Sequence, residues 1–314
     1  MDVMVAQPND RQHDPSAEVA VSPEMFAPGG PGVELCYQTF GSPDADPLLL
    51  VMGLGGPMTW WDPELCRMLA ARGFYVIRFD NRDTGRSTKV AGRVTRSMLV
   101  RAFAGRWVKP PYTLHDLGAD AFALLDHLGI EAAHLCGVSM GGMVVQTMAV
   151  DRPRRVLSLT SIMSTTGKRS VGWQHPRLLP VLLARRGRGR TAYAEGSAAI
   201  WALIGSPLFP ADPDRVLAKA EETFDRGWSD GGVLRQMMAI TTQANRSQRL
   251  GALRVPALVV HGTADRMVHS SGGRATAAAI PGAELLLIEG MGHDLPPELF
   301  ETFADGIRRT ADRA

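Results

Sequence analysis

The sequence of 314 residues predicts an α/β fold, a doubly wound and mostly parallel sheet with an inserted helical lid. Short, continuous apolar runs that end at turn residues are typical of strands buried on both faces of a parallel sheet. Helical stretches alternate with these runs, which indicates right-handed crossovers between neighbouring strands. The 33 glycines and 21 prolines suit the many short turns that such an alternation requires.

Each predicted element follows from its own residues. An edge strand is predicted at residues 33–41, where apolar and polar side chains alternate. The continuous apolar runs predict buried strands at residues 48–53, 74–80, 134–139, 156–163, 257–262 and 284–290. Helices are predicted between these runs at residues 63–72, 114–128, 140–151, 271–280 and 296–309.

The organisation of the chain has four predicted parts. Residues 1–31 are rich in Pro, Asp, Gln and Gly, lack an apolar period and predict a mobile N-terminal extension. Residues 32–164 and 251–314 form the two halves of the core. Residues 165–250 lack a convincing buried strand and carry apolar residues at helical intervals, as at residues 178–183 and 216–224. We interpret this insertion as an active-site lid. The alternative is a set of surface helices without a function.

Composition excludes several classes of function. With 34 basic and 32 acidic residues, the net charge of +2 gives the protein no global field that would attract nucleic acid or an acidic membrane. Three cysteines (Cys36, Cys66 and Cys136) argue against a disulfide framework, and no Cys/His spacing suggests a metal. The sequence has neither a membrane-length apolar run nor the pattern of a signal peptide, so we expect a cytoplasmic protein.

The central motif is Gly137–Val138–Ser139–Met140–Gly141, a G-x-S-x-G pattern. It ends a predicted strand and begins a predicted helix, which is the setting in which a nucleophilic serine lies on a tight turn. Side chains at the two glycines would collide across such a turn. The helix start would also present N–H groups and a positive dipole end to an oxyanion. A serine that only caps the helix is the alternative interpretation.

A serine nucleophile needs a base, and eight histidines are available. His293 lies in a glycine-flanked loop after the last predicted strand, where it can reach over the serine. His261 is more consistent with a buried strand. His269 is interpreted as a helix cap or a substrate contact.

The base needs an orienting carboxylate, for which Asp265 is the candidate because it follows the predicted strand 257–262. The chain order Ser139, Asp265, His293 is the one expected on this fold. Asp294 is adjacent to His293 and is poorly placed to reach its ring. For the oxyanion we predict the backbone N–H groups of Leu54 and Met140. A plain flexible turn is the alternative for the glycine-rich loop that contains Leu54.

Five separated motifs, LLLVMGLGG, VIRFDNRDTGRST, CGVSMGG, VVHGTADRMV and GMGHDLP, together resemble the α/β-hydrolase superfamily over residues 32–314. Within it, the chain is similar to actinobacterial carboxylesterases and lipases related to the aclacinomycin methylesterases. The resemblance implies an eight-stranded sheet, a triad of Ser139, Asp265 and His293, and an oxyanion hole at Leu54 and Met140. Many members have His-Gly where this chain has Met52–Gly53, a change that the esterases share.

Two charged segments have competing interpretations. Residues 78–87 are largely architectural in the family, although their charges could also contact substrate. The arginines between residues 185 and 190 are interpreted as a solvated loop, with anionic headgroups or a phosphorylated acyl carrier as the alternative.

The sequence therefore predicts a cofactor-free serine hydrolase that cleaves carboxylic esters, including lipid esters or thioesters, through an acyl-enzyme. The apolar, aromatic and Met-rich lid favours a small-molecule or lipid-like ester. Transfer of the acyl group to an alcohol or amine, or ligand binding without turnover, are the alternatives. The sequence does not predict the oligomeric state.

Overall fold

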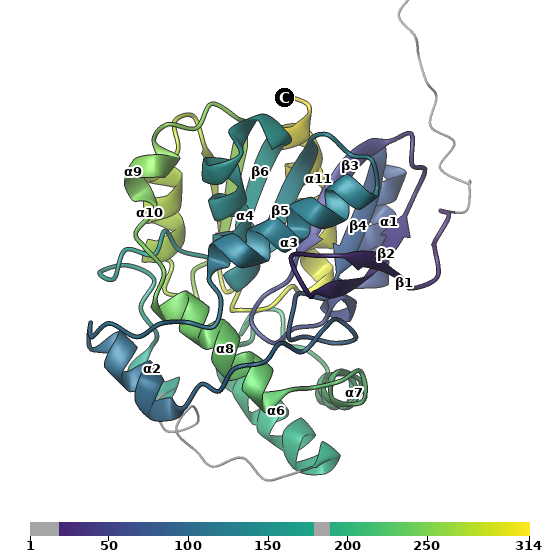
Figure 1. The fold of residues 1–314 in the computed structure, drawn as a ribbon. Coiled ribbons are helices and arrows are strands. Elements are labelled where there is room, and N and C mark those ends of the chain that lie inside the picture. The colour runs from purple at the N-terminus through teal and green to yellow at the C-terminus, as the bar shows by residue number, and fades with distance from the viewer. Residues whose placement is uncertain (1–18, 179–188) are drawn as a thin grey trace, which may run out of the picture.

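The computed structural model describes residues 19–178 and 189–314, which fold around one eight-stranded sheet with the order β1-β2-β4-β3-β5-β6-β7-β8 (Figure 1). The pairs β1–β2 and β2–β4 are antiparallel and all other neighbours are parallel. The predicted fold class, a mostly parallel eight-stranded sheet, is confirmed. The strands are β1 (Met25–Pro28), β2 (Glu34–Phe40), β3 (Asp46–Val51), β4 (Phe74–Phe79), β5 (Ala133–Val138), β6 (Val156–Ile162), β7 (Ala257–Gly262) and β8 (Glu284–Ile288).

The N-terminal boundary needs a correction. We predicted a mobile extension over residues 1–31, but β1 pairs with β2 and Val21 forms a bridge to Phe40. The strand was missed because it is short, lies at the sheet edge and gains its order from backbone pairing rather than from an apolar period. Residues 1–18 lie outside the described residues.

Helices cover both faces of the sheet (Figure 1). On one face lie α3 (Leu114–His127), α4 (Met140–Asp151) and α10 (Ser271–Ala279), and on the other lie α1 (Pro63–Ala71) and α11 (Phe300–Ala311). Short 3-10 turns are η1 (Met58–Trp60), η2 (Pro153–Arg155), η3 (Pro176–Leu178) and η4 (Pro297–Leu299). The predicted helix at 296–309 thus begins as a 3-10 turn.

The central strands are apolar throughout because successive side chains enter two different cores. In β3, Leu48 and Leu50 pack with the α1 and α11 face, whereas Leu49 and Val51 pack with the α3 and α4 face. All four are fully buried. This period of two explains why an uninterrupted apolar run is the correct signal for these strands.

Helices make up most of the described part of the long insertion between β6 and β7. They are α6 (Arg190–Ile204), α7 (Pro213–Asp225), α8 (Asp230–Thr241) and α9 (Ser247–Leu250). No strand occurs in the described part of residues 165–250. The apolar stretch after Leu178 and the arginines before Gly189 fall outside the described residues. A further helix, α2 (Arg96–Phe103), packs against α8 and had not been predicted.

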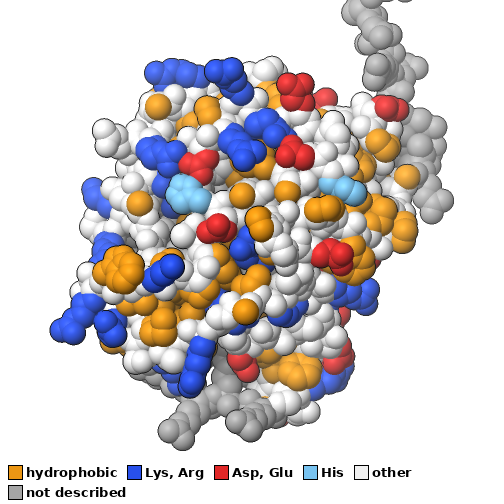
Figure 2. Space-filling view, viewed as in Figure 1, with side chains coloured by type: hydrophobic (Ala, Val, Ile, Leu, Met, Phe, Trp, Pro, Cys, Tyr) orange, Lys and Arg blue, Asp and Glu red, His pale blue; other side chains and the backbone are white. Residues whose placement is uncertain are grey.

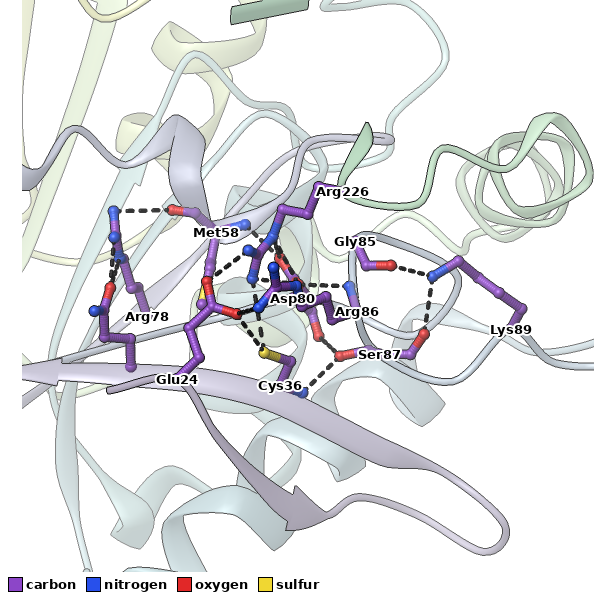
Figure 3. Close-up of polar contacts among 11 residues, drawn as sticks. Glu24, Cys36, Met58, Arg78, Asp80, Gly85, Arg86, Ser87, Lys89 and Arg226 are labelled. Atoms are coloured by element: carbon purple, nitrogen blue, oxygen red, sulfur yellow. Dashed lines mark hydrogen bonds and ion pairs between the residues drawn. The ribbon is translucent and has the colours of Figure 1, made fainter. Parts of the chain in front are cut away.

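Charged side chains fasten the insertion to the core (Figure 3). Asp80, fully buried after β4, accepts hydrogen bonds from the N–H groups of Met58 and Arg86 at 2.6 and 2.8 Å. The guanidinium of Arg226, at the end of α7, lies 2.9 Å from the Asp80 carboxylate and 2.6 Å from Glu24, just before β1. Arg226 of the insertion is therefore paired both with the core, through Asp80, and with the N-terminal segment, through Glu24.

A second buried ion pair, between Arg235 and Asp83, connects α8 to the core. Arg235 binds both carboxylate oxygens of Asp83 at 2.7 and 2.8 Å, and the hydroxyl of Tyr112 donates to the same carboxylate at 2.7 Å. These internal partners favour the architectural interpretation of residues 78–87.

We expect Asp80→Asn to lower the free energy of unfolding by about 3 kcal/mol, because it leaves Arg226 buried with half of its charge compensation. Glu24→Gln is the matched control. Its side chain is 23% exposed, and we expect a loss of about 1 kcal/mol or less. Urea unfolding of both variants at one pH measures the difference, and equal losses would contradict the central role of Asp80.

Candidate active site

Ser139 lies on the turn between β5 and α4, with φ 57° and ψ −117°. A positive φ is strained for a residue with a side chain, and such strain persists only where the surroundings enforce it. A Cβ on Gly137 would overlap the backbone of Gly141, and one on Gly141 would overlap the carbonyl of Val51. The two glycines of the motif therefore allow the helix to begin against the ends of β3 and β5.

His293 follows β8 and points at the serine. Its Nε2 lies 2.9 Å from Oγ of Ser139, and its Nδ1 lies 2.7 Å from Oδ2 of Asp265. The backbone N–H of His293 donates to the carbonyl of Ile204 at 2.7 Å, so the end of α6 helps to hold this loop. The structure thus brings together the three side chains that the sequence indicated.

Asp265 follows β7 and its carboxylate is fully buried. One oxygen accepts the backbone N–H groups of Met267 and Val268 at 2.8 and 2.9 Å. Burial by itself would raise the pKa of Asp265, but the charge of His293 and hydrogen bonds from His261 and His293 outweigh it and lower this pKa. The carboxyl is therefore ionised at ordinary assay pH.

The other candidate residues do not contact Ser139, although His261 lies 3.5 Å from the carboxylate of Asp265. His261 is fully buried in β7, as expected, and its Nε2 lies 2.8 Å from the carbonyl of Val268. His269 lies at the start of α10, where its Nδ1 accepts the N–H of Ser271 at 3.2 Å. Asp294 contacts Ser206 rather than His293 through its carboxylate, and burial raises its pKa.

The glycine-rich loop at residues 52–56 lies against the serine. A Cβ built on Gly53 would be 3.2 Å from Cβ of Ser139. Within residues 19–178 and 189–314, the N–H groups of Leu54 and Met140 donate to no protein acceptor. That of Met140 is one of the unpaired donors at the start of α4. Both groups are therefore free to receive an oxygen atom.

The insertion holds this loop through Gln236, a fully buried residue of α8 that the sequence analysis did not identify. Its Oε1 accepts the N–H of Gly55 at 2.8 Å, while its Nε2 donates to the carbonyl of Arg82 and the hydroxyl of Thr84, both at 2.9 Å. A glutamine in a helix carries no sequence signal for such a contact, because its partner is 181 residues away.

Apolar side chains of the insertion cover the same loop. Trp228 and Val233 lie against Gly55, where a Cβ would come within 3.1 and 3.0 Å of them and where the φ of +67° disfavours a side chain. Trp60, beyond the loop, packs edge-to-face on Trp201 of α6 at 5.3 Å. The described residues contain no group of three His, Cys, Asp or Glu side chains that could hold a metal ion, and no helix among them is long and apolar enough to cross a membrane.

Comparisons with known proteins identify the family to which the chain belongs. The model of a family described as alpha/beta hydrolase fold matches residues 46–298. The chain belongs to this family, and it is an enzyme of the carboxylic ester hydrolase class.

Particular relatives span most of the chain. It is 30% identical over 298 residues to rhodomycin D methylesterase DnrP of Streptomyces peucetius, an alignment that covers 88% of this chain and 94% of the relative. It is 28% identical to 3-oxoadipate enol-lactonase 2 of Acinetobacter baylyi, with 74% and 76% covered. The crystal structure of the enol-lactonase from Burkholderia xenovorans LB400 superposes with a TM-score of 0.72 at 25% identity, covering 92% of this chain and 100% of that one.

We expect Asp265→Asn to lower kcat for a short p-nitrophenyl ester by about 10⁴-fold, because an amide at this position leaves His293 in the wrong tautomer. The asparagine oxygen can still accept the N–H groups of Met267 and Val268, so the fold should persist.

Asp294→Asn is the matched control, since Asp294 adjoins His293 in sequence but contacts Ser206. We expect its kcat to stay within a few-fold of the unaltered enzyme. Equal losses in the two variants would contradict the assignment of Asp265.

Proposed function

We propose that the protein hydrolyses carboxylic esters of hydrophobic small molecules through an acyl-enzyme formed on Ser139. The observation that carries this proposal is the chain of hydrogen bonds from Asp265 through His293 to Ser139. Beside Ser139 lie the N–H groups of Leu54 and Met140, which have no protein acceptor among the described residues. Such a chain of hydrogen bonds, in which a buried carboxylate orients the base, is the arrangement that activates a serine hydroxyl.

The first half of the reaction forms the acyl-enzyme. Nδ1–H of His293 donates to the ionised Asp265, which leaves Nε2 free to take the proton from Oγ of Ser139. The serine oxygen attacks the acyl carbon, and the resulting oxyanion accepts hydrogen bonds from the N–H groups of Leu54 and Met140. The protonated His293 then gives its proton to the departing alcohol.

The second half regenerates the serine. Water enters in place of the alcohol, His293 removes one of its protons, and the hydroxide attacks the acyl carbon. The tetrahedral intermediate uses the same two N–H donors, and its collapse returns the proton to Ser139 and releases the carboxylic acid. No cofactor takes part in either half of this scheme.

The helical insertion supports a hydrophobic substrate. We propose that residues 165–250 act as a lid, because Trp228 and Val233 lie over the loop that contains Leu54. A substrate bound between the lid and Ser139 would place its apolar part against these side chains. The names of two relatives, a methylesterase and an enol-lactonase, also support an ester as the reacting group.

We expect Ser139→Ala to reduce kcat for short p-nitrophenyl esters by about 10⁶-fold and to abolish labelling by a fluorophosphonate probe. Thermal unfolding should change little, because alanine experiences the same backbone strain as serine at this φ. Retained turnover in a folded Ser139→Ala protein would overturn the proposal.

We expect Gln236→Met to lower kcat by about 10-fold or more with little change in KM, because it releases Gly55 and with it the neighbouring oxyanion donor. Gln236→Glu keeps an acceptor for Gly55 and should recover part of the loss. Met237→Leu, at the next position of α8, is the control for general effects on the helix. A rise in KM alone, or an equal loss in the control, would contradict a positioning role for Gln236.

A further inference from the structure

Helix α2 and the residues after it present large apolar side chains to solvent. Val100, Phe103 and Trp107 are 67%, 80% and 82% exposed. Val100 and Phe103 are three residues apart and therefore share one face of the helix. Folded monomers seldom leave several large apolar side chains together on the surface without a function.

The opposite face of α2 already has its partners. Met98, Leu99 and Ala102 pack with Leu234 and Met238 of α8. Helix α2 therefore has two apolar faces: one packs against α8, and the other, with Val100 and Phe103, is exposed to solvent.

The charged side chains of the segment that contains α2 have one sign. Residues 84–115 contain no Asp or Glu, in a chain that has 32 of them. Residues 90–115 contain five exposed basic side chains, none of which pairs with a carboxylate in the described part of the chain. These are Arg93, Arg96, Arg101, Arg106 and Lys109.

A second basic segment continues the surface. The guanidinium of Arg169 donates to the carbonyls of Ala102 and Phe103 at 3.2 and 3.1 Å, which fixes the segment after β6 against α2. Nearby in this segment, Lys168 is exposed and the Trp173 ring is 46% exposed. Figure 2 shows hydrophobic side chains gathered over the region of α2 with Lys and Arg around them.

We propose that this α2 surface, formed by Val100, Phe103 and Trp107 with Arg96, Arg101 and Arg106, binds a lipid surface that carries negative charge. Aromatic and aliphatic side chains enter the boundary between headgroups and acyl chains, and guanidinium groups bind the phosphates. Tryptophan favours this boundary because its ring is apolar and its N–H is polar.

Two other partners fit the surface less well. In a symmetric dimer the uncompensated arginines of one copy would face those of the other. Nucleic acid would use the arginines and the aromatic rings but would gain nothing from the exposed aliphatic side chain of Val100. The charge and the apolar face together match an anionic bilayer.

The test is co-sedimentation of the full chain with vesicles of phosphatidylcholine, alone or mixed with phosphatidylglycerol. We expect binding to the mixed vesicles at low ionic strength, weak binding to phosphatidylcholine alone, and release by salt. The double variants Phe103→Ser/Trp107→Ser and Arg101→Glu/Arg106→Glu should each reduce partitioning by about 10-fold or more.

Matched controls lie elsewhere on the molecule. Phe26→Ser changes another exposed aromatic residue, 49% exposed on β1, and Arg154→Glu reverses an exposed charge in η2. Both should bind as the unaltered protein does, and so should Ser139→Ala, which separates this proposal from the proposed ester hydrolysis.

Four results would overturn the proposal. Two concern the vesicles: the protein does not bind the mixed vesicles at low salt, or the control variants lose as much vesicle binding as the α2 variants. Two concern other partners: Phe103→Ser dissociates a dimer of the protein, or the same surface binds a single-stranded oligonucleotide more tightly than the vesicles.

Discussion

The structure depends on the close approach of β3 and β5 at their carboxyl ends, where α4 begins against the carbonyl of Val51. No side chain fits at Gly137 or Gly141, and Ser139 accepts a positive φ because both flanking segments are fixed. This one contact places the serine hydroxyl, the first N–H groups of α4 and the glycine loop of residues 52–56 together. The acid and the base then need only follow β7 and β8, whose carboxyl ends lie at the same edge of the sheet.

Buried charges connect the insertion to this edge. Asp80 holds Arg226 at the end of α7, and Asp83 holds Arg235 of α8. An ion pair in the interior gains little in stability over an apolar pair, but it is costly to break and has few alternative geometries. The two pairs therefore set the position of α8 with respect to the core, and that position puts Gln236 within hydrogen-bond reach of Gly55.

The sequence predicted the features that depend on short residue patterns or on the order of residues along the chain. Buried strands appear as apolar runs, the serine turn as Gly137 and Gly141, and the acid and base as polar residues that follow the last two strands. It did not predict β1, whose order comes from pairing with β2, or α2, whose packing face is completed by Leu234 and Met238. The contacts between α2 and α8 join residues far apart in the chain, and β1 is too short for its residue types to indicate a strand.

Helix α8 joins the two surfaces for which we propose functions. Its Gln236 reaches the loop beside Ser139, whereas Leu234 and Met238 pack beneath α2. Arg235 of the same helix pairs with Asp83, which fixes α8 to the core. A lipid surface that binds α2 would therefore lie near α8, which belongs to the same insertion as Trp228 and Val233 over Gly55. The segment after β6 makes a second connection between α2 and the region of the triad, because Arg169 binds α2 while Trp173 stacks on His269, close to Asp265 in the chain.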